Sequence, residues 1–160
     1  MTNLTVRAAS AADAAIISDC NRAMALETEG MELREEVITN GVKRLLERPE
    51  YGFYVIAQQG EQIAGTLMVT TEWSDWRDGL FWWIQSVYVM PKFRRQGVYR
   101  AMYDFIRRRA SEYPDVRGYR LYVERENIIA QKTYQSLGMH ETDYYLYEEL
   151  LPDTDFLVRK

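Results

Sequence analysis

The chain has 160 residues, enough for one domain with a sizeable hydrophobic core. Its 20 Lys and Arg residues are outnumbered by 24 Asp and Glu residues, and the net charge of −4 argues against nucleic acid as a partner. One cysteine and one histidine exclude an internal disulfide and a Cys- or His-paired metal site. We expect neither a signal peptide nor a membrane span, and therefore a metal-free, cytoplasmic protein that does not bind membranes.

The N-terminal half predicts two helices and three strands. Residues 10–13 read Ser-Ala-Ala-Asp, a capping-box pattern that typically begins a helix, and the Ala-rich stretch after it ends near Ala25. In the second helix apolar side chains recur at helical spacing until Pro49 stops it. The elements expected here are strands at 4–8, 53–57 and 63–71 and helices at 10–25 and 35–47.

The C-terminal half predicts strands that alternate with helices. Pro91 closes an apolar, aromatic and β-branched run, and Gly138 ends the last helix. The elements expected here are strands at 82–90, 119–123 and 142–148 and helices at 98–113 and 128–137. The order β-α-α-β-β-β-α-β-α-β predicts an α/β protein with a mixed sheet and helices on its faces.

A strand, a basic turn and a helix follow one another between residues 82 and 109. The turn at 92–96 precedes Gly97, which lets the backbone approach a ligand closely. From residue 92 to 109 there are seven Lys and Arg residues and one acid, Asp104. The first N–H groups of a helix lack intrahelical partners and its dipole favours an anion, so the pattern is typical of a phosphate site.

Two consecutive motifs lie in this strand and turn, Val87-Tyr88-Val89-Met90-Pro91 and Arg94-Arg95-Gln96-Gly97-Val98-Tyr99. They resemble the acetyl-CoA signature of the GNAT superfamily of N-acetyltransferases, V-x-P followed by Q/R-x-x-G-x-G/A at the start of a helix. Arg94 matches the first position and Gly97 the first glycine, whereas Tyr99 stands where the family prefers Gly or Ala.

Another motif lies downstream of these two, Asn127-Ile-Ile-Ala130-Gln-Lys-Thr-Tyr134-Gln-Ser-Leu-Gly138-Met139. It is similar to the family's block N-x-x-A-x-x-x-Y-x-x-x-G-F, with Met139 in place of Phe. The resemblance covers nearly the whole chain. It implies a single GNAT domain, residues 1–160, with a central mixed sheet of six to seven strands that splays between strands four and five, and about four helices on its faces.

The resemblance also implies a site for acetyl-CoA as cosubstrate. The pantetheine arm is expected to lie in the splay and to bind the backbone of Val87 and Val89 as an added strand would. The N–H groups of residues 96–100 are expected to hold the pyrophosphate. The expected cofactor-binding residues are Val87, Tyr88, Val89, Arg94, Arg95, Gln96, Gly97, Val98, Tyr99, Arg100, Asn127 and Ala130.

Tyr134 matches the family's general-acid tyrosine. A phenol with a pKa near 10 is protonated at neutral pH and can donate a proton or hydrogen bond to the departing thiolate. The amine must lose a proton, and the sequence leaves the base open between four carboxylates that each also suit a solvated surface position. They are Glu27, Glu29, Glu72 and Glu124.

The acceptor site is expected beside a tryptophan-rich loop at 73–83. The tryptophans suit either a wall for an alkylammonium or aromatic amine, or a core and a homodimer interface. The candidate acceptor residues are Glu27, Glu29, Trp73, Trp83 and Gln85. This region loosely resembles polyamine acetyltransferases, but Gln85 and Ser86 stand where those enzymes carry acidic residues.

Three functions remain open at this point. The leading interpretation is an N-acetyltransferase that moves the acetyl group of acetyl-CoA to a primary amine, in a small amine or an amino-containing metabolite. The alternatives are an acetyltransferase for a protein lysine or N-terminus, and a non-catalytic acyl-CoA-binding module.

Overall fold

The computed structural model describes residues 3–159, which form two compact units. The first unit runs to Leu121 and includes the chain from Phe156 onward, and the second comprises Tyr122–Asp155. The elements of the first unit are β1 (Leu4–Ala8), a short 3-10 turn (Ala11–Asp13), α1 (Ala14–Glu29), α2 (Glu35–Leu46), β2 (Gly52–Gln59), β3 (Gln62–Ser74), β4 (Gly79–Val89), a second 3-10 turn (Pro91–Phe93), α3 (Val98–Ala110) and β5 (Val116–Arg120).

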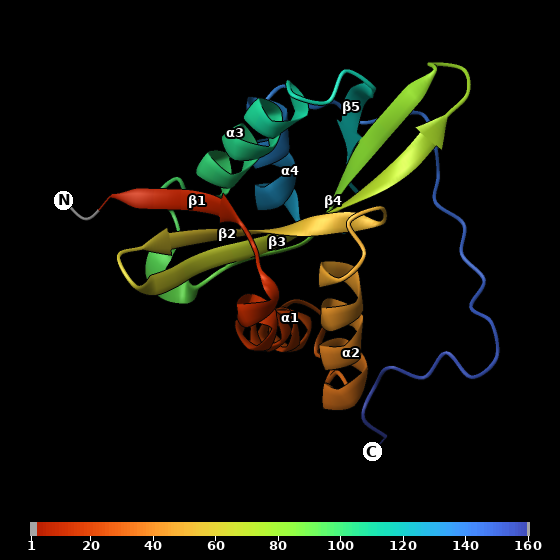
Figure 1. Ribbon diagram of the computed structural model, residues 1–160. Coiled ribbons are helices and arrows are strands. Elements are labelled where there is room, and N and C mark those ends of the chain that lie inside the picture. Colours follow the sequence, from red (N-terminus) through yellow and green to blue (C-terminus); the bar gives the residue numbers. More distant parts are fainter. Residues whose placement is uncertain (1–2, 160) are drawn as a thin grey trace. The chain divides into compact units, whose positions relative to one another are not determined.

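The sheet has the spatial order β1-β2-β3-β4-β5 (Figure 1). Its first four strands pair antiparallel, and β5 pairs parallel to β4. The mixed sheet and the splay between the fourth and fifth strands are confirmed, because β5 pairs only with residues 80–83 of β4. The expected strand count of six to seven is wrong for the described residues, which form five.

The helices α1 and α2 pack on one face of the sheet. The core on this side joins Ile17 of α1 and Val42 of α2 to Tyr54 and Ile56 of β2, and all four side chains are buried. Alternation along the strands fixes which other residues share this face. Met68 pairs with Tyr54 and also packs against this core, so the even-numbered residues of β3 that follow it point toward α1 and α2.

The opposite face of the sheet carries α3 and an aromatic core. The ring of Trp82 in β4 lies 5.2 Å from that of Phe53 and 5.6 Å from that of Tyr113. The fully buried Tyr103 of α3 contacts Tyr119 of β5 at a ring distance of 5.8 Å. These contacts fix α3, and therefore the loop before it, against β4 and β5.

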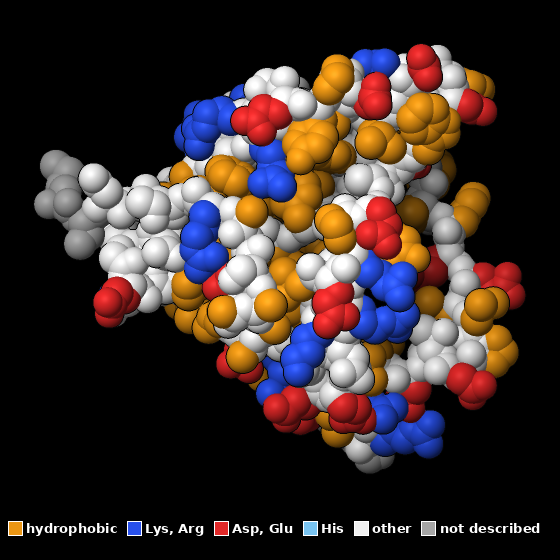
Figure 2. Space-filling model, in the orientation of Figure 1, with side chains coloured by type: hydrophobic (Ala, Val, Ile, Leu, Met, Phe, Trp, Pro, Cys, Tyr) orange, Lys and Arg blue, Asp and Glu red, His pale blue; other side chains and the backbone are white. Residues whose placement is uncertain are grey.

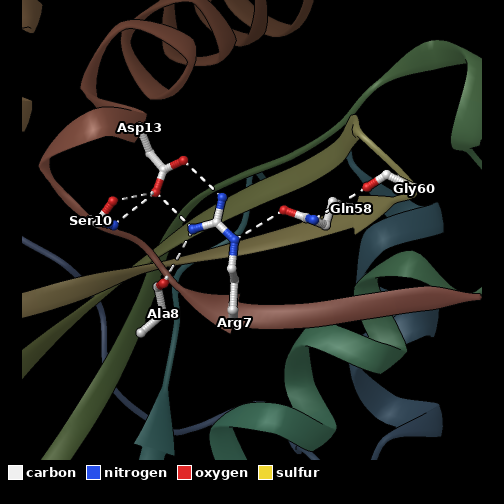
Figure 3. A network of polar contacts seen from close by, with 6 residues as sticks. All are labelled: Arg7, Ala8, Ser10, Asp13, Gln58 and Gly60. Carbon is white, nitrogen blue, oxygen red and sulfur yellow. Dashed lines mark hydrogen bonds and ion pairs between the residues drawn. The ribbon is translucent and has the colours of Figure 1, made fainter.

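A partly buried ion pair fixes the junction between β1 and α1 (Figure 3). Two guanidinium nitrogens of Arg7 donate to the Asp13 carboxylate at 2.8 and 2.9 Å, and the Ser10 N–H donates to it at 2.7 Å. The third nitrogen of Arg7 reaches Gln58 of β2 at 3.0 Å. The arginine, supported by the Ser10 N–H, lowers the pKa of Asp13 from 3.8 to about 2. The predicted helix start at residues 10–13 is confirmed.

The second unit contains α4 (Ile128–Ser136), and the expected strand at 142–148 is absent from it. Tyr144, Tyr145, Leu146 and Tyr147 are all exposed. Four consecutive large side chains cannot all face one core, because successive residues of a strand point to opposite sides. The expected single domain spanning both units stays a prediction.

Two further elements differ from their predicted bounds. The strand expected at 119–123 lies at Val116–Arg120, because its register is set by pairing with β4 rather than by local pattern. The β3–β4 hairpin is longer than expected and carries Trp73 and Trp76, which are 59% and 86% exposed. Hydrophobic side chains are visible at the surface in the region of this hairpin (Figure 2).

Candidate functional site

The candidate site begins at an unpaired edge of β4. The last pair between β4 and β5 joins Trp83 to Arg120, and beyond it that edge of β4 has no strand partner among residues 3–159. The Met90 N–H donates to the Ala64 carbonyl of β3 at 2.8 Å. Alternate residues of a strand direct their backbone groups to the same side, so Val89, one residue earlier, faces the open edge, and Val87 does so too.

A β-bulge separates this open segment from the paired half of β4. Two residues of β4, Ser86 and Val87, lie opposite one residue of β3, because Thr66 pairs with Tyr88 and Met68 with Gln85. Ser86 lies in the bulge with φ of 52°, in the left-handed region that a side chain rarely adopts. A bulge bends its strand and increases the local twist, which fits the separation of β4 from β5.

The loop before α3 has the form expected of an anion site. Gly97 precedes the helix with φ of 78°, and a Cβ there would meet no atom within 4 Å, so the space above it is open. Arg95 also lies in the left-handed region, with φ of 62°. The first α-helical hydrogen bond joins the Ala101 N–H to the Gly97 carbonyl at 3.0 Å. The first N–H groups of α3 therefore come before the intrahelical ladder, the position at which helices bind phosphate oxygens.

Gly65 of β3 allows the start of α3 to lie close to the sheet. A Cβ at this position would lie 2.9 Å from the Tyr88 carbonyl oxygen and 3.1 Å from a methyl group of Val98. The site therefore depends on a residue outside the predicted motifs, which local patterning does not reveal.

Tyr99 replaces the small residue of the family signature, and its ring turns toward the next helical turn. It stacks on Tyr103 at a ring distance of 6.1 Å and an interplanar angle of 25°. The ring is half-buried against α3. Its backbone N–H stays at the helix start, so the residues present fit a pyrophosphate there.

Arg94 is held between the open edge of β4 and the last turn of α1. Two of its nitrogens bind the Glu27 carboxylate at 2.6 and 2.9 Å, and its Nε donates to the Val89 carbonyl at 3.0 Å. The Tyr88 hydroxyl donates to Glu27 at 3.3 Å. The Arg94 guanidinium lowers the pKa of Glu27. Burial, with the charge of Glu27, raises the pKa of Tyr88. Glu27, expected at the acceptor site, is therefore engaged with the loop.

A second polar group lies where β4 and β5 separate, on the face that carries α1 and α2. We call it the strand-separation cluster, and its members are Thr70, Glu72, Trp83, Gln85 and Arg120. Glu72 Oε1 accepts from Arg120 Nη1 at 2.6 Å and from the Trp83 indole N–H at 3.2 Å. Gln85 donates to the Thr70 hydroxyl at 2.6 Å. Trp83 and Gln85, two of the candidate acceptor residues, thus lie together.

The other candidate acceptor residues lie elsewhere. Trp73 is paired with Leu80 on the face opposite Glu72, so it does not join Trp83. Glu29 is exposed at the end of α1. The sequence interpretation named Glu72 only as a possible base and missed Arg120. No local sequence signal identifies Arg120, because its position follows from the pairing of β5 with β4.

The second unit holds the remaining predicted residues on α4. The Asn127 side chain caps the helix, because its Oδ1 accepts from the Ala130 N–H at 3.1 Å. The Gln131 amide binds the carbonyls of Glu124 and Arg125, which fixes the turn before the helix. Tyr134 is half-buried, and burial raises the pKa of its phenol.

Within residues 3–159, no group of His, Cys, Asp and Glu side chains could hold a metal ion, and no helix is long and apolar enough to span a membrane.

Comparison with solved structures shows close similarity to a possible acetyltransferase from Clostridium difficile 630. The two chains are 42% identical, and the match covers 92% of this chain and 97% of that one with a TM-score of 0.86. A predicted acetyltransferase from Clostridium acetobutylicum, solved with acetyl-CoA, is 19% identical with a TM-score of 0.76, over 96% of this chain and 100% of that one.

An aminoglycoside acetyltransferase from an uncultured soil metagenomic sample, solved with sisomicin, is 14% identical with a TM-score of 0.74, over 92% of this chain and 97% of that one. These last two likenesses show a shared fold. A comparison with curated proteins found no match. The family model described as "Acetyltransferase (GNAT) family" matches residues 16–139. The chain therefore belongs to the GNAT acetyltransferase family and is an acyltransferase that uses acetyl-CoA.

Proposed function

We propose that this enzyme transfers the acetyl group of acetyl-CoA to a primary amine of a small molecule. The observation that carries the proposal is the open edge of β4, which begins beyond the Trp83–Arg120 pair and ends at the start of α3. It places strand-like hydrogen-bonding groups beside an anion site, as a thioester joined to a pyrophosphate requires.

Each part of this edge has a separate role toward acetyl-CoA. The backbone of Val87 and the N–H of Val89 would bind the amide-containing arm, since Arg94 already donates to the Val89 carbonyl. The N–H groups at the start of α3 would bind the pyrophosphate. Arg94 occupies the Val89 carbonyl and holds the loop to α1 through Glu27. We therefore assign Glu27 to positioning of the cofactor loop.

Tyr134 is proposed as the general acid. The amine nitrogen attacks the thioester carbonyl carbon, the carbon–sulfur bond breaks, the sulfur receives a proton from Tyr134, and the amine releases one to solvent. Burial raises the pKa of Tyr134 above its usual value of 10, so the phenol holds its proton at neutral pH and can supply it to sulfur. It then regains a proton from solvent.

The strand-separation cluster is proposed as the acceptor side of the site. Trp83 supplies an aromatic surface and Gln85 a side-chain amide next to the open edge. The soil acetyltransferase was solved in complex with sisomicin, an aminoglycoside, and that complex supports a small-molecule acceptor. The homodimer and the cytoplasmic location stay predictions.

Release of the CoA thiol from acetyl-CoA, followed against a panel of amines, tests the proposal. The panel holds polyamines, aromatic ethylamines, amino acids, aminoglycosides and lysine peptides. Release with a small amine is expected. Release with the peptides alone would favour protein acetylation, and acetyl-CoA binding without release on any member would point to a non-catalytic module.

A further inference from the structure

The strand-separation cluster contains an ion pair that bridges two strands across a third. Glu72 lies on β3 and Arg120 on β5, with β4 between them. Their side chains are 41% and 25% exposed, so the pair borders solvent. It lies at the last rung before the open edge of β4, because Trp83 is paired with Arg120 and with Thr70 in the same row.

The orientation of Arg120 is fixed from two sides. Its guanidinium carbon lies 3.7 Å from the ring centre of Phe81, and its Nη1 binds Glu72 Oε1. The same oxygen accepts the indole N–H of Trp83, which holds the carboxylate in place. Such a planar guanidinium, stacked on a ring and anchored at one corner, is pre-organised to bind a planar anion.

Hydrogen-bonding groups remain available on both charged side chains. Within the part of the chain that the structure describes, Arg120 Nε and Nη2 and Glu72 Oε2 make no hydrogen bond to protein. The cluster therefore offers donors from a cation and an acceptor from an anion, side by side. Its net charge is zero, because Thr70, Trp83 and Gln85 are neutral.

We propose that the acceptor is an amine that also carries a carboxylate, such as an amino acid, and that Arg120 binds this carboxylate. The inference rests on the proposed acetyl transfer and names its substrate class. Glu72 positions Arg120 through Oε1 and presents Oε2 to the N–H groups of the amine. The indole of Trp83 covers the apolar part of the acceptor.

The charge balance argues against a polyamine. A polycation gains little attraction from a neutral cluster, and each of its ammonium groups near Arg120 meets a like charge. A zwitterion, by contrast, has an ammonium group for Glu72 and a carboxylate for Arg120. Charge-assisted hydrogen bonds to a guanidinium that is held in place are stronger than hydrogen bonds between neutral groups. We therefore expect the carboxylate to raise the affinity for the acceptor about tenfold or more.

The test compares acceptors that differ only in the carboxylate. The pairs are L-phenylalanine and 2-phenylethylamine, L-lysine and cadaverine, and glycine and methylamine. The wild-type protein, with saturating acetyl-CoA, is expected to give at least a tenfold higher kcat/KM for the carboxylate member of at least one pair. Equal or higher kcat/KM for the decarboxylated members of all three pairs would overturn the proposal.

Two variants assign the effect to Arg120. Arg120→Gln is expected to bring the ratio of kcat/KM for the amino acid to kcat/KM for the amine down to about one, mainly through a higher KM for the amino acid. Arg120→Lys, which keeps the charge, should recover part of the preference. Arg108→Gln, in the exposed last turn of α3, is the control and should leave both values unchanged.

A purely structural role for the ion pair gives a different result. Loss of a bridge between β3 and β5 would lower kcat/KM for both members of each pair equally and leave their ratio intact, which would overturn the assignment. If only amines that lack a carboxylate are acetylated, the inference about the substrate class is refuted, but the proposed acetyl transfer stands. No acetylation of any member refutes both.

Discussion

The ion pair between Arg7 and Asp13 gives a quantitative prediction for stability. Asp13→Asn keeps the size of the side chain and removes its charge. The difference between the usual pKa of 3.8 and the folded-state pKa of about 2 corresponds to about 2 kcal/mol of folding free energy at pH 7. The side chain of Asp13 is 11% exposed but that of Arg7 is 41% exposed, so solvent screens part of this interaction. The variant is therefore expected to lose about 1–2 kcal/mol of folding free energy.

The pH dependence of this loss follows from the sign of the shift. The folded protein lowers the pKa of Asp13, so the unfolded chain binds the proton first as the pH falls. The carboxylate's contribution is complete well above pH 3.8, falls to about half near pH 3, and is lost as the pH falls through about 2. The difference between wild type and variant should shrink over the same window.

Urea denaturation at pH 7 and at pH 3 measures this difference. Asp19→Asn, an exposed change on the same helix, is the matched control and should alter the free energy of unfolding by less than about 0.5 kcal/mol. An Asp13→Asn loss that stays the same at both pH values would refute the electrostatic explanation. It would leave only the geometry of the helix start as the cause.

Three further changes test the active site. Gly65→Ala places a Cβ 2.9 Å from the β4 backbone. This variant should lower the free energy of unfolding by about 1–3 kcal/mol and raise the KM for acetyl-CoA. Its control is Gly41→Ala, at a helical glycine with open space around it, which should not destabilise the protein. Glu27→Gln should raise the KM for acetyl-CoA by up to about fivefold without changing the acceptor KM, since the ion pair is partly exposed, and Glu29→Gln should change neither. Tyr134→Phe should keep the fold by circular dichroism and lower kcat at least about tenfold; an unchanged kcat would remove this phenol from the mechanism.

Much of the fold could be predicted because its signals are local. The capping pattern at Ser10 and the apolar spacing of α2 and α3 depend on residues a few positions apart. Gly97 before α3 is also a local signal, since the backbone there has a φ of 78°, a conformation that suits glycine. These features predicted a strand and a helix close to where β4 and α3 lie.

The unpredicted parts of the site depend on pairings that are distant in the sequence. Glu27 meets Arg94 across 67 positions, and Arg120 meets Glu72 across 48. The register of β5 decides which of its side chains joins the α1 face, and that register follows from contact with β4. The strand predicted in the tyrosine-rich segment after α4 is absent for a related reason: β-branched and aromatic composition alone does not supply a pairing partner.

The central claim is transfer of the acetyl group from acetyl-CoA to an amine nitrogen. Incubation with acetyl-CoA that carries a deuterated acetyl group, together with the best acceptor of the panel, tests it directly by mass spectrometry of the product. We predict the deuterated acetyl group on the amine nitrogen, in an amount equal to the CoA released. Deuterated acetate with an unmodified amine would show hydrolysis instead and would contradict the account.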